Sequence, residues 1–271
     1  MLKDLYFRHL MRHAAARAAS TPVKQAVDAV AGRAVTSALV RALREAASGD
    51  FSSEEQACIC RIEAIRTAFR RSTATVRQPD WGSKPGAGAE PATITREVGE
   101  LYRSTSKSKL WAGLLMKLMR ECRPQACLEL GTCLGISACY QAAGLHLNGS
   151  GRLLTLEGAP EFAAIAKKNF SQLGLSNVQV VTGPFQRTLE GALADLGPID
   201  YAFIDGHHQE MPTLDYFGKI CAQANPGAVF VFDDINWSDG MKRAWRTITQ
   251  TRNVRHAMDL HALGICVYGV P

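Results

Sequence analysis

Several acidic side chains of this chain stand directly after apolar stretches that predict buried strands. Glu157, Asp205 and the pair Asp233 and Asp234 each follow such a stretch. In an open parallel sheet, ligands bind in the crevice beyond the carboxyl ends of the strands, so we expect these carboxylates to face one crevice. A single acid at such a place is often only a helix cap. Several acids in one crevice instead predict a site that accepts hydrogen bonds or holds a cation.

The stretch Cys127–Tyr140, CLELGTCLGISACY, predicts a strand, a glycine-spaced turn and an apolar helix. This order is typical of nucleotide cradles. The spacing Glu-x-Gly-x-x-x-Gly lacks the middle glycine of a dinucleotide fingerprint, and Cys133 stands where backbone would approach a pyrophosphate. Glu129, two residues before Gly131, would repel a phosphate. The turn favours a ligand with a cationic end, such as S-adenosylmethionine (SAM), or serves only helix–strand packing.

The elements that must position these residues alternate between strand and helix from Arg96 onward. The predicted strands are 126–130, 152–156, 178–181, 201–204, 228–232, 255–260 and 265–268. The predicted helices are 108–121, 136–145, 160–173, 186–196, 212–224 and 240–251. This alternation predicts an α/β fold, a Rossmann-like, doubly wound, seven-stranded and mostly parallel sheet. The last two strands lie too close for a crossover helix, so we expect an antiparallel edge strand.

Residues 1–71 predict an N-terminal helical segment, with helices at 2–18 and 23–47 and a third after the capping box Ser52-x-x-Glu55. The basic, alanine-rich start is also typical of an organellar transit peptide. The helical pattern continues well beyond any cleavage point, which favours a helix of the mature fold.

The third helix carries an apolar stripe made of Cys58, Ile62, Ile65 and Phe69. A stripe of this kind must pack on neighbouring helices, on the main domain or on a second subunit. We therefore predict that the segment is a lid over the crevice or an oligomerisation segment, with a possible homodimer through these helices.

Residues 72–104 are predicted to be a linker or loop, because prolines and glycines interrupt the stretch between Ser72 and Thr95. Trp81 within it is either a packing anchor or a side chain that closes over a bound ligand. The main ligand-binding domain is then expected at 105–271.

Composition limits the classes of protein that the chain can belong to. A hydrophobic content of 46%, a charged content of 21% and a net charge of +6 are ordinary for a soluble enzyme. The basic residues form no cluster interleaved with aromatic residues, so we expect no nucleic acid partner. The eight cysteines form no C-x-x-C pair, which favours buried thiols in a reducing cytoplasm. The sequence contains no apolar run of 18 residues, so we expect no membrane span.

Residues from about 105 to 269 resemble class I SAM-dependent methyltransferases, in particular the small-molecule O-methyltransferase branch that includes catechol and caffeoyl-CoA O-methyltransferases. The segment ELGTCLGIS matches the branch's ELG-x-x-x-G-x-S turn, and FIDGHH and VFDDINW match two later motifs. Glu157, about 20 residues beyond the turn, can accept both hydroxyls of a ribose. The resemblance implies that the positions that bind SAM are Glu129, Gly131, Gly135, Ser137, Glu157, Gly183, Gln186 and Asp205.

The resemblance also implies a metal and a base. In that branch three ligands hold a magnesium ion, and the matching residues here are Asp205, Asp233 and Asp234, an all-oxygen set suited to a hard cation. His208 stands where the branch carries its general-base lysine, and His207 is the alternative. The chain departs from the branch at Asp234, where asparagine is customary. It departs again at Phe185, where a small polar residue is usual.

Three functions are compatible with these residues. The first is methyl transfer from SAM to a hydroxyl of a small molecule, with His208 and Asp205 as the catalytic residues. The second is an intramolecular reaction of SAM that cyclises or cleaves it and releases methylthioadenosine. The third is a non-catalytic module that binds SAM or NAD, although the missing glycine disfavours NAD.

The sequence does not identify the acceptor, because residues 1–104 find no match in the catechol type. Trp237, Met241 and Trp245 either line an acceptor pocket or pack as a helix face.

Overall fold

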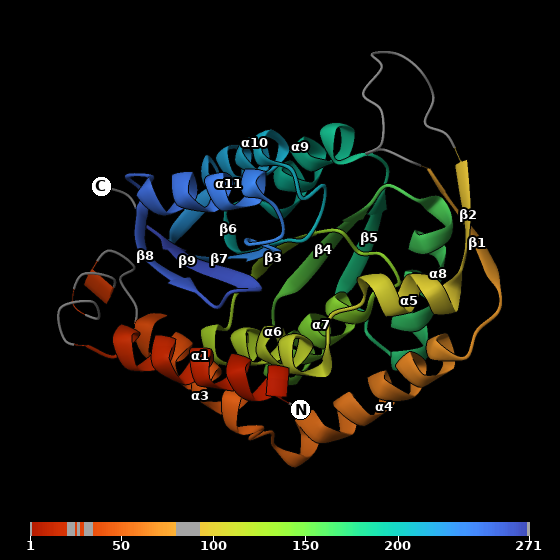
Figure 1. The fold of residues 1–271 in the computed structure, drawn as a ribbon, viewed down its shortest axis with the longest axis horizontal. Helices are drawn as coiled ribbons and strands as arrows, with labels where there is room; N and C mark the ends of the chain where they lie inside the picture. The colour runs from red at the N-terminus through yellow and green to blue at the C-terminus, as the bar shows by residue number, and fades with distance from the viewer. Residues whose placement is uncertain (1, 21–24, 26–27, 30–34, 80–92, 270–271) are drawn as a thin grey trace.

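The fold is built on one central sheet (Figure 1). The structure is a computed structural model, which describes residues 2–20, 25, 28–29, 35–79 and 93–269. The strands follow the order β5-β4-β3-β6-β7-β9-β8. Their bounds are β3 (Ala126–Leu130), β4 (Arg152–Glu157), β5 (Val178–Thr182), β6 (Ile199–Ile204), β7 (Ala224–Asp233), β8 (Val254–Asp259) and β9 (Leu263–Tyr268). Strand β9 pairs antiparallel with β7 and β8, and the other pairs are parallel. The prediction of a doubly wound, mostly parallel sheet is confirmed.

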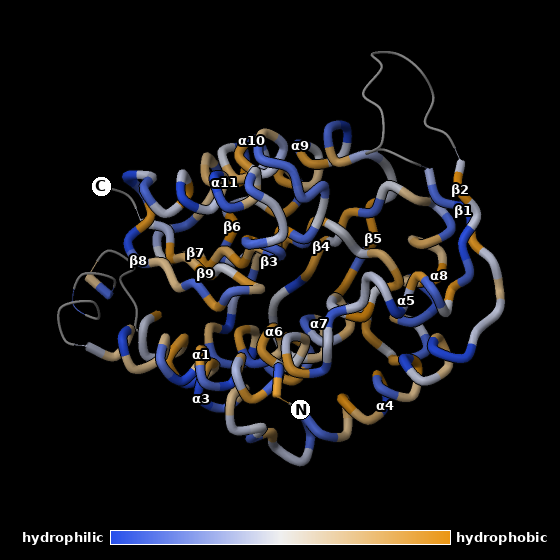
Figure 2. The backbone as a smooth tube through the Cα atoms, in the orientation of Figure 1, coloured by the Kyte–Doolittle hydropathy of each residue, from blue (hydrophilic) through white to orange (hydrophobic). Residues whose placement is uncertain are grey.

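Helices cover both faces of this sheet (Figure 1). One face carries α6 (Lys109–Cys122), α7 (Ile136–Asn148) and α8 (Pro160–Leu173), and the other carries α9 (Phe185–Leu196), α10 (Glu210–Cys221) and α11 (Asp239–Gln250). Successive residues of a strand point to opposite faces, so Cys127 joins the core under α6 and α7, whereas Leu128 joins the core under α9 and α10. Both faces are therefore apolar, which is why the strands read as continuous hydrophobic runs (Figure 2).

The front helices form an additional layer outside α6 and α7 (Figure 1). They are α1 (Leu2–Ala18), α3 (Val35–Ser48) and α4 (Ser53–Arg70). The predicted capping box is present, because Ser52 Oγ accepts the Glu55 N–H and the Glu55 side chain accepts the Ser52 N–H. Most of the N-terminal half of the helix expected at 23–47 lies outside the described residues, and its C-terminal half is α3.

The apolar stripe of α4 is covered within the chain itself. Ile62 and Ile65 are buried in the same core as α6 and α7, and Cys58 and Phe69 are half-buried against it. Tyr140 of α7 also donates a 2.6 Å hydrogen bond to Glu63 of α4. The stripe therefore needs no second subunit to bury it, and the argument for a homodimer through it loses its basis.

The structure differs from the expected linker at 72–104. Strands β1 (Thr75–Pro79) and β2 (Thr93–Glu97) form an antiparallel pair, and helix α5 (Val98–Thr105) follows directly. The apolar residues Val76, Val98 and Leu101 pack into a small core with Phe162 of α8. This tertiary contact stabilises regular structure that the local prolines and glycines do not predict. Trp81 lies outside the described residues.

Within the described parts of the chain, no helix is both long and apolar enough to span a bilayer.

Candidate active site

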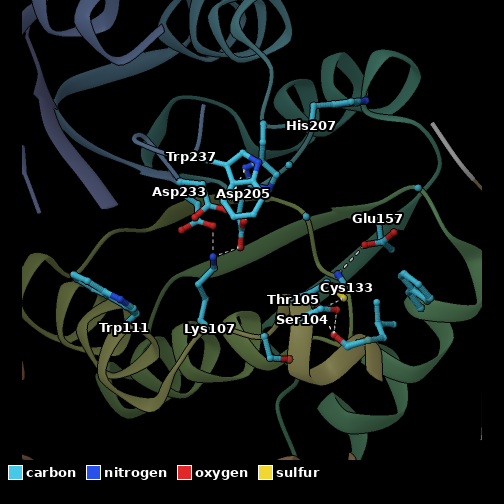
Figure 3. Close-up of a pocket in the computed structure, with 18 of the residues that line it drawn as sticks. Ser104, Thr105, Lys107, Trp111, Cys133, Glu157, Asp205, His207, Asp233 and Trp237 are labelled. Carbon is cyan, nitrogen blue, oxygen red and sulfur yellow. Dashed lines mark hydrogen bonds and ion pairs between the residues drawn. The ribbon is translucent and has the colours of Figure 1, made fainter. Parts of the chain in front are cut away.

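The carboxyl ends of β3, β4, β6 and β7 open into one cavity of about 810 Å³ (Figure 3). This volume is in the range of small-molecule pockets. The loops after these strands line it, together with the loop between α5 and α6 and the start of α1. The cavity therefore lies where an open α/β sheet is expected to bind its ligand.

The glycine turn after β3 allows two loops to touch at the floor of the cavity. Gly131 has a φ of +102°, and a Cβ there would lie 1.9 Å from the backbone oxygen of Asp205. No other residue type fits at this position, because both the backbone conformation and the contact require glycine. Gly135 has a different function: a Cβ there would press on Ala166 of α8 at 2.9 Å, and Gly135 does not line the cavity.

Glu129 lies beneath this turn and does not face the cavity. Its carboxylate is fully buried and accepts hydrogen bonds from Thr155 Oγ1 at 2.5 Å and Gln141 Nε2 at 2.7 Å. Burial raises the pKa of Glu129 to about 7, although these hydrogen bonds oppose the shift. Thr155 also bonds to Thr132 of the turn at 2.6 Å, so Glu129 holds the turn in place. Ser137 is likewise buried and outside the cavity lining.

Glu157 lies at the end of β4 and lines the cavity. Its two carboxylate oxygens accept the backbone N–H groups of Cys133 at 2.7 Å and Ala159 at 2.8 Å. Burial raises the pKa of Glu157. The backbone N–H of Gly158 also bonds to this carboxylate. A carboxylate has about four lone-pair positions, so about one position is left for a ligand.

The neighbouring loop after β5 supports this arrangement. Gly183 donates its N–H to the backbone oxygen of Glu157 at 2.8 Å and has a φ of +142°. It does not line the cavity, whereas Phe185 and Gln186 do. The structure therefore brings Gly131, Glu157, Gln186 and Asp205 together around the cavity. It keeps Glu129, Gly135, Ser137 and Gly183 behind its wall.

A lysine that was not predicted from the sequence lies between two of the predicted acids. Lys107 Nζ donates to Asp233 Oδ2 and lies 3.6 Å from Asp205 Oδ2 (Figure 3). The side chains of Lys107 and Asp205 are each 14% exposed, and that of Asp233 is 3% exposed. Lys107 belongs to the short loop between α5 and α6, where its Ser-Lys-Ser-Lys context reads as an ordinary polar helix start. No local pattern indicates that its side chain reaches the ends of β6 and β7.

The protonation of this group depends on its burial and on its own charges. Burial and the neighbouring Asp205 raise the pKa of Asp233 to about 7, although Lys107 opposes the shift. Burial also raises the pKa of Asp205 against the effect of Lys107. The Lys107 pKa is lowered by burial but raised more strongly by Asp205 and Asp233, so its net shift is upward. The two carboxylates therefore favour the charged form of the lysine.

The two histidines after β6 have different surroundings. His208 Nε2 lies 3.7 Å from Asp205 Oδ1, and its Nδ1 lies 3.9 Å from Asp234 Oδ2. His207 Nδ1 instead shares a 2.8 Å hydrogen bond with the Tyr216 hydroxyl, and burial lowers the His207 pKa. His208 is thus the histidine beside the acids.

Several residues in the loops around this site have a strained backbone conformation. Cys133, His207, His208 and Asp234 all have positive φ values, between 43° and 63°. Non-glycine residues with positive φ cost free energy and cluster at functional sites, where the surrounding structure holds them. All four residues line the cavity.

Three groups in the site could hold a metal ion. Asp205, His208 and Asp233 offer ligand atoms that lie within 4.8 Å of one another. The two carboxylates suit a hard divalent cation. Asp234, expected as the third ligand, is not part of this group and lies beside His208 instead. The donor atoms fit a cation, provided that the ammonium group of Lys107 moves away from them.

Three further aromatic side chains line the cavity, two of them buried and one exposed. Phe7 of α1 and Trp111 of α6 line it with ring centroids 4.9 Å apart, and Trp237 lies at the mouth with 75% of its surface exposed. Met241 and Trp245 are buried and do not line the cavity, so for these two residues the packing interpretation holds. The α1 residues at the mouth were not predicted from the sequence.

The strand order, the glycine turn and the acids at the strand ends agree with the resemblance to class I methyltransferases. Residues 128–235 match a family model described as a methyltransferase domain.

Curated relatives extend the match. The chain is 39% identical to a catechol O-methyltransferase of Niastella koreensis over 127 residues, which cover 45% of this chain and 54% of that protein. It is 37% identical to a catechol O-methyltransferase of Mycobacterium tuberculosis over 150 residues, which cover 55% of this chain and 64% of that protein. The match therefore spans between about half and two thirds of these relatives.

Solved structures share the fold at lower identity. An O-methyltransferase from Bacillus cereus in complex with SAH (S-adenosylhomocysteine) aligns with a TM-score of 0.53 and 24% identity, covering 62% of this chain and 84% of that one. The O-methyltransferase TomG from Streptomyces achromogenes, in complex with SAM, aligns with a TM-score of 0.54 and 22% identity, covering 61% and 82%. At these identities the likeness concerns the fold alone.

Proposed function

We propose that this protein transfers a methyl group from SAM to a hydroxyl group of a small molecule. The observation that carries the proposal is the arrangement of one cavity. Glu157 stands beside the glycine turn and lines the cavity, and His208 stands beside Asp205 at the end of β6. The named activities of the catechol O-methyltransferase relatives point to the same reaction.

We infer that SAM lies across the ends of β3 and β4. Glu157 accepts its ribose hydroxyls, and Gln186 and Phe185 contact the adenine from the start of α9. Gly131 lets the ligand approach the turn closely, because no Cβ projects there. Glu129 does not contact the ligand in this arrangement; its hydrogen bond with Thr155 holds the turn in position.

In the proposed reaction, His208 removes the proton from the acceptor hydroxyl. The acceptor oxygen attacks the methyl carbon of SAM as the carbon–sulfur bond breaks. The electron pair of that bond passes to sulfur, which becomes the neutral thioether of SAH, and the proton stays on His208. Orientation of the two reactants supplies much of the rate in such a displacement, and proton transfer to a placed base adds to it.

A divalent cation such as Mg²⁺ is a further part of the proposal. Asp205 and Asp233, with His208, would hold it. When bound, such an ion lowers the pKa of a hydroxyl group that coordinates it. The proton transfer to His208 is argued from the residues of the chain and does not depend on this ion.

The acceptor is proposed to be a small aromatic alcohol, of which a catechol is the simplest test. Phe7, Trp111 and Trp237 give the cavity flat apolar walls, which suit an aromatic ring. The curated relatives are named catechol O-methyltransferases, which agrees with this choice.

Product analysis tests the proposal. Purified protein is incubated with SAM alone and with SAM plus a panel of catechols, and the adenosine products are separated by mass spectrometry. Formation of SAH together with a methylated acceptor, only when the acceptor is present, is the expected result. Methylthioadenosine formed from SAM alone would favour the intramolecular reaction. Tight binding of SAM with no product from any acceptor would favour a binding module.

A further inference from the structure

Lys107 occupies the position in which a cation would neutralise the acids of the site. Its ammonium group donates to Asp233 Oδ2 and lies 3.6 Å from Asp205 Oδ2, and the two aspartates are direct neighbours (Figure 3). The same two aspartates belong to the group of ligand atoms that could hold a metal. A buried lysine of the chain and a divalent cation would therefore use the same carboxylates.

The two cations exclude each other on simple geometric grounds. A magnesium ion sits at about 2.1 Å from each carboxylate oxygen that binds it. Lys107 Nζ already donates a hydrogen bond to Asp233 Oδ2 and lies 3.6 Å from Asp205 Oδ2. A divalent ion on these oxygens would lie against the ammonium group in a poorly hydrated site, where like charges repel strongly.

The position of Lys107 is held by the front layer of the fold. Arg66 of α4 donates a 2.6 Å hydrogen bond from Nη1 to the backbone oxygen of Lys107. The Arg66 side chain is only 7% exposed and pairs with Glu63 at 2.9 Å. The lysine therefore projects from an anchored loop and is not a free surface side chain.

We propose that Lys107 is a built-in counter-ion that competes with divalent metal for Asp205 and Asp233, so that a metal ion binds only by displacing it. The resting site then carries its own cation, supplied by the loop between α5 and α6. This inference uses the cation site of the proposed function, but it concerns metal affinity and needs no methyl transfer for its test.

The test measures the binding of Mn²⁺ alone, as a spectroscopic substitute for Mg²⁺, by electron paramagnetic resonance. The full-length wild type is compared with Lys107→Met and with the matched control Lys109→Met, which removes the same charge from an exposed position two residues away. Lys107→Met is expected to bind Mn²⁺ at least about tenfold more tightly, because the competing charge is gone. Lys109→Met and the charge-conserving Lys107→Arg should bind like the wild type.

A second neutral variant protects the test against a folding defect. Lys107→Gln retains a donor for Asp233 and should show the same gain in affinity, with a circular dichroism melt as the check on folding. Unchanged or weaker Mn²⁺ binding in the folded neutral variants would overturn the proposal, as would an equal gain in Lys109→Met. SAH binding, measured separately by calorimetry, reports on the proposed function. If the protein did not bind SAH, that result would count against SAM chemistry, but the comparison of Mn²⁺ affinities would still test the role of Lys107.

Discussion

At the scale of single residues, the site combines groups that face the ligand with groups that hold them. Glu157 and His208 line the cavity, whereas Glu129 acts from below through Thr155. The strained backbone at His208 and Asp234 indicates that the surrounding structure enforces this arrangement. Substitutions at these positions should therefore separate ligand binding from catalysis.

Replacing Glu157 should weaken the binding of the cofactor. Glu157→Gln removes the negative charge that we expect to accept the ribose hydroxyls, and a hydrogen bond to a charged group contributes about 1.5–3 kcal/mol. SAH affinity, measured by calorimetry, should fall by roughly ten- to a hundredfold. The exposed Glu190 offers a control, since Glu190→Gln should leave the affinity unchanged. Equal affinity in Glu157→Gln and the wild type would remove Glu157 from the ligand site.

Replacing His208 should slow the reaction without weakening cofactor binding. Asparagine is the suitable substitute because it tolerates the positive φ of this position. Loss of a general base costs roughly 10²- to 10⁴-fold in rate, so kcat of His208→Asn should fall by that order while SAH affinity stays within about twofold. His207→Asn serves as the comparison, because His207 bonds to Tyr216 instead of the acids. If His207→Asn caused the larger fall in kcat, the base would have to be reassigned.

At the scale of elements, the front helices are bound to the core by buried charges as well as by apolar contacts. Lys117 of α6 donates to Glu55 of α4 at 2.7 Å and lies 2.8 Å from Glu45 of α3. Glu55 also accepts a 3.2 Å hydrogen bond from Arg120 Nε and caps the start of α4. One lysine thus joins three helices, and α4 in turn anchors the loop of Lys107 through Arg66.

Breaking this connection should destabilise the protein. Lys117→Met leaves the buried carboxylate of Glu55 without its main partner, and removing one member of a buried ion pair typically costs about 3–5 kcal/mol. Arg120 still contacts Glu55, so the lower end of that range is expected. Urea unfolding followed by circular dichroism measures the change, with the exposed Lys109→Met as the control. A loss below about 1 kcal/mol would mean that apolar packing alone holds the layer.

At the scale of the whole molecule, the protonation of buried acids links stability to pH. The pKa of Glu129 lies near 7 in the folded protein against an ordinary value of 4.5. Between these two values the folded state binds more protons than the unfolded state, so this residue lowers stability as pH rises from about 4.5 to 7. Above that range its effect is constant.

Glu129→Gln should remove this dependence. The amide cannot ionise, so the free energy of unfolding of the variant, relative to that of the wild type, should increase between pH 5 and pH 8. The expected increase is about 1–3 kcal/mol, because a shift of one pKa unit corresponds to about 1.4 kcal/mol. Melting temperatures across this range, taken without ligand, measure the difference. The other buried acids titrate in both proteins and cancel. A constant difference between the two proteins would show that Glu129 is already ionised at pH 5.

The local pattern of the chain is sufficient to predict the sheet and its ligand edge. Strands buried on both faces and helices with one apolar face produce local periodicities, so the bounds predicted for Pro160–Leu173 and Ala126–Leu130 are those that the structure has. Acids at strand ends follow from the same pattern, because parallel strands share one carboxyl edge. The sequence therefore predicts Glu157 and Asp205 at the ligand crevice, and both line the cavity.

Packing between distant segments decides what else enters the site. Lys107, Phe7 and the pairing of Thr75–Pro79 with Thr93–Glu97 depend on contacts between residues far apart in sequence. The local sequence around each of them has no pattern that specifies such a partner. Glu129 was predicted to face the ligand, yet the pleat of β3 turns its side chain into the layer occupied by Gln141 of α7. Periodicity gives the position of a residue along an element, and only packing decides which groups it meets.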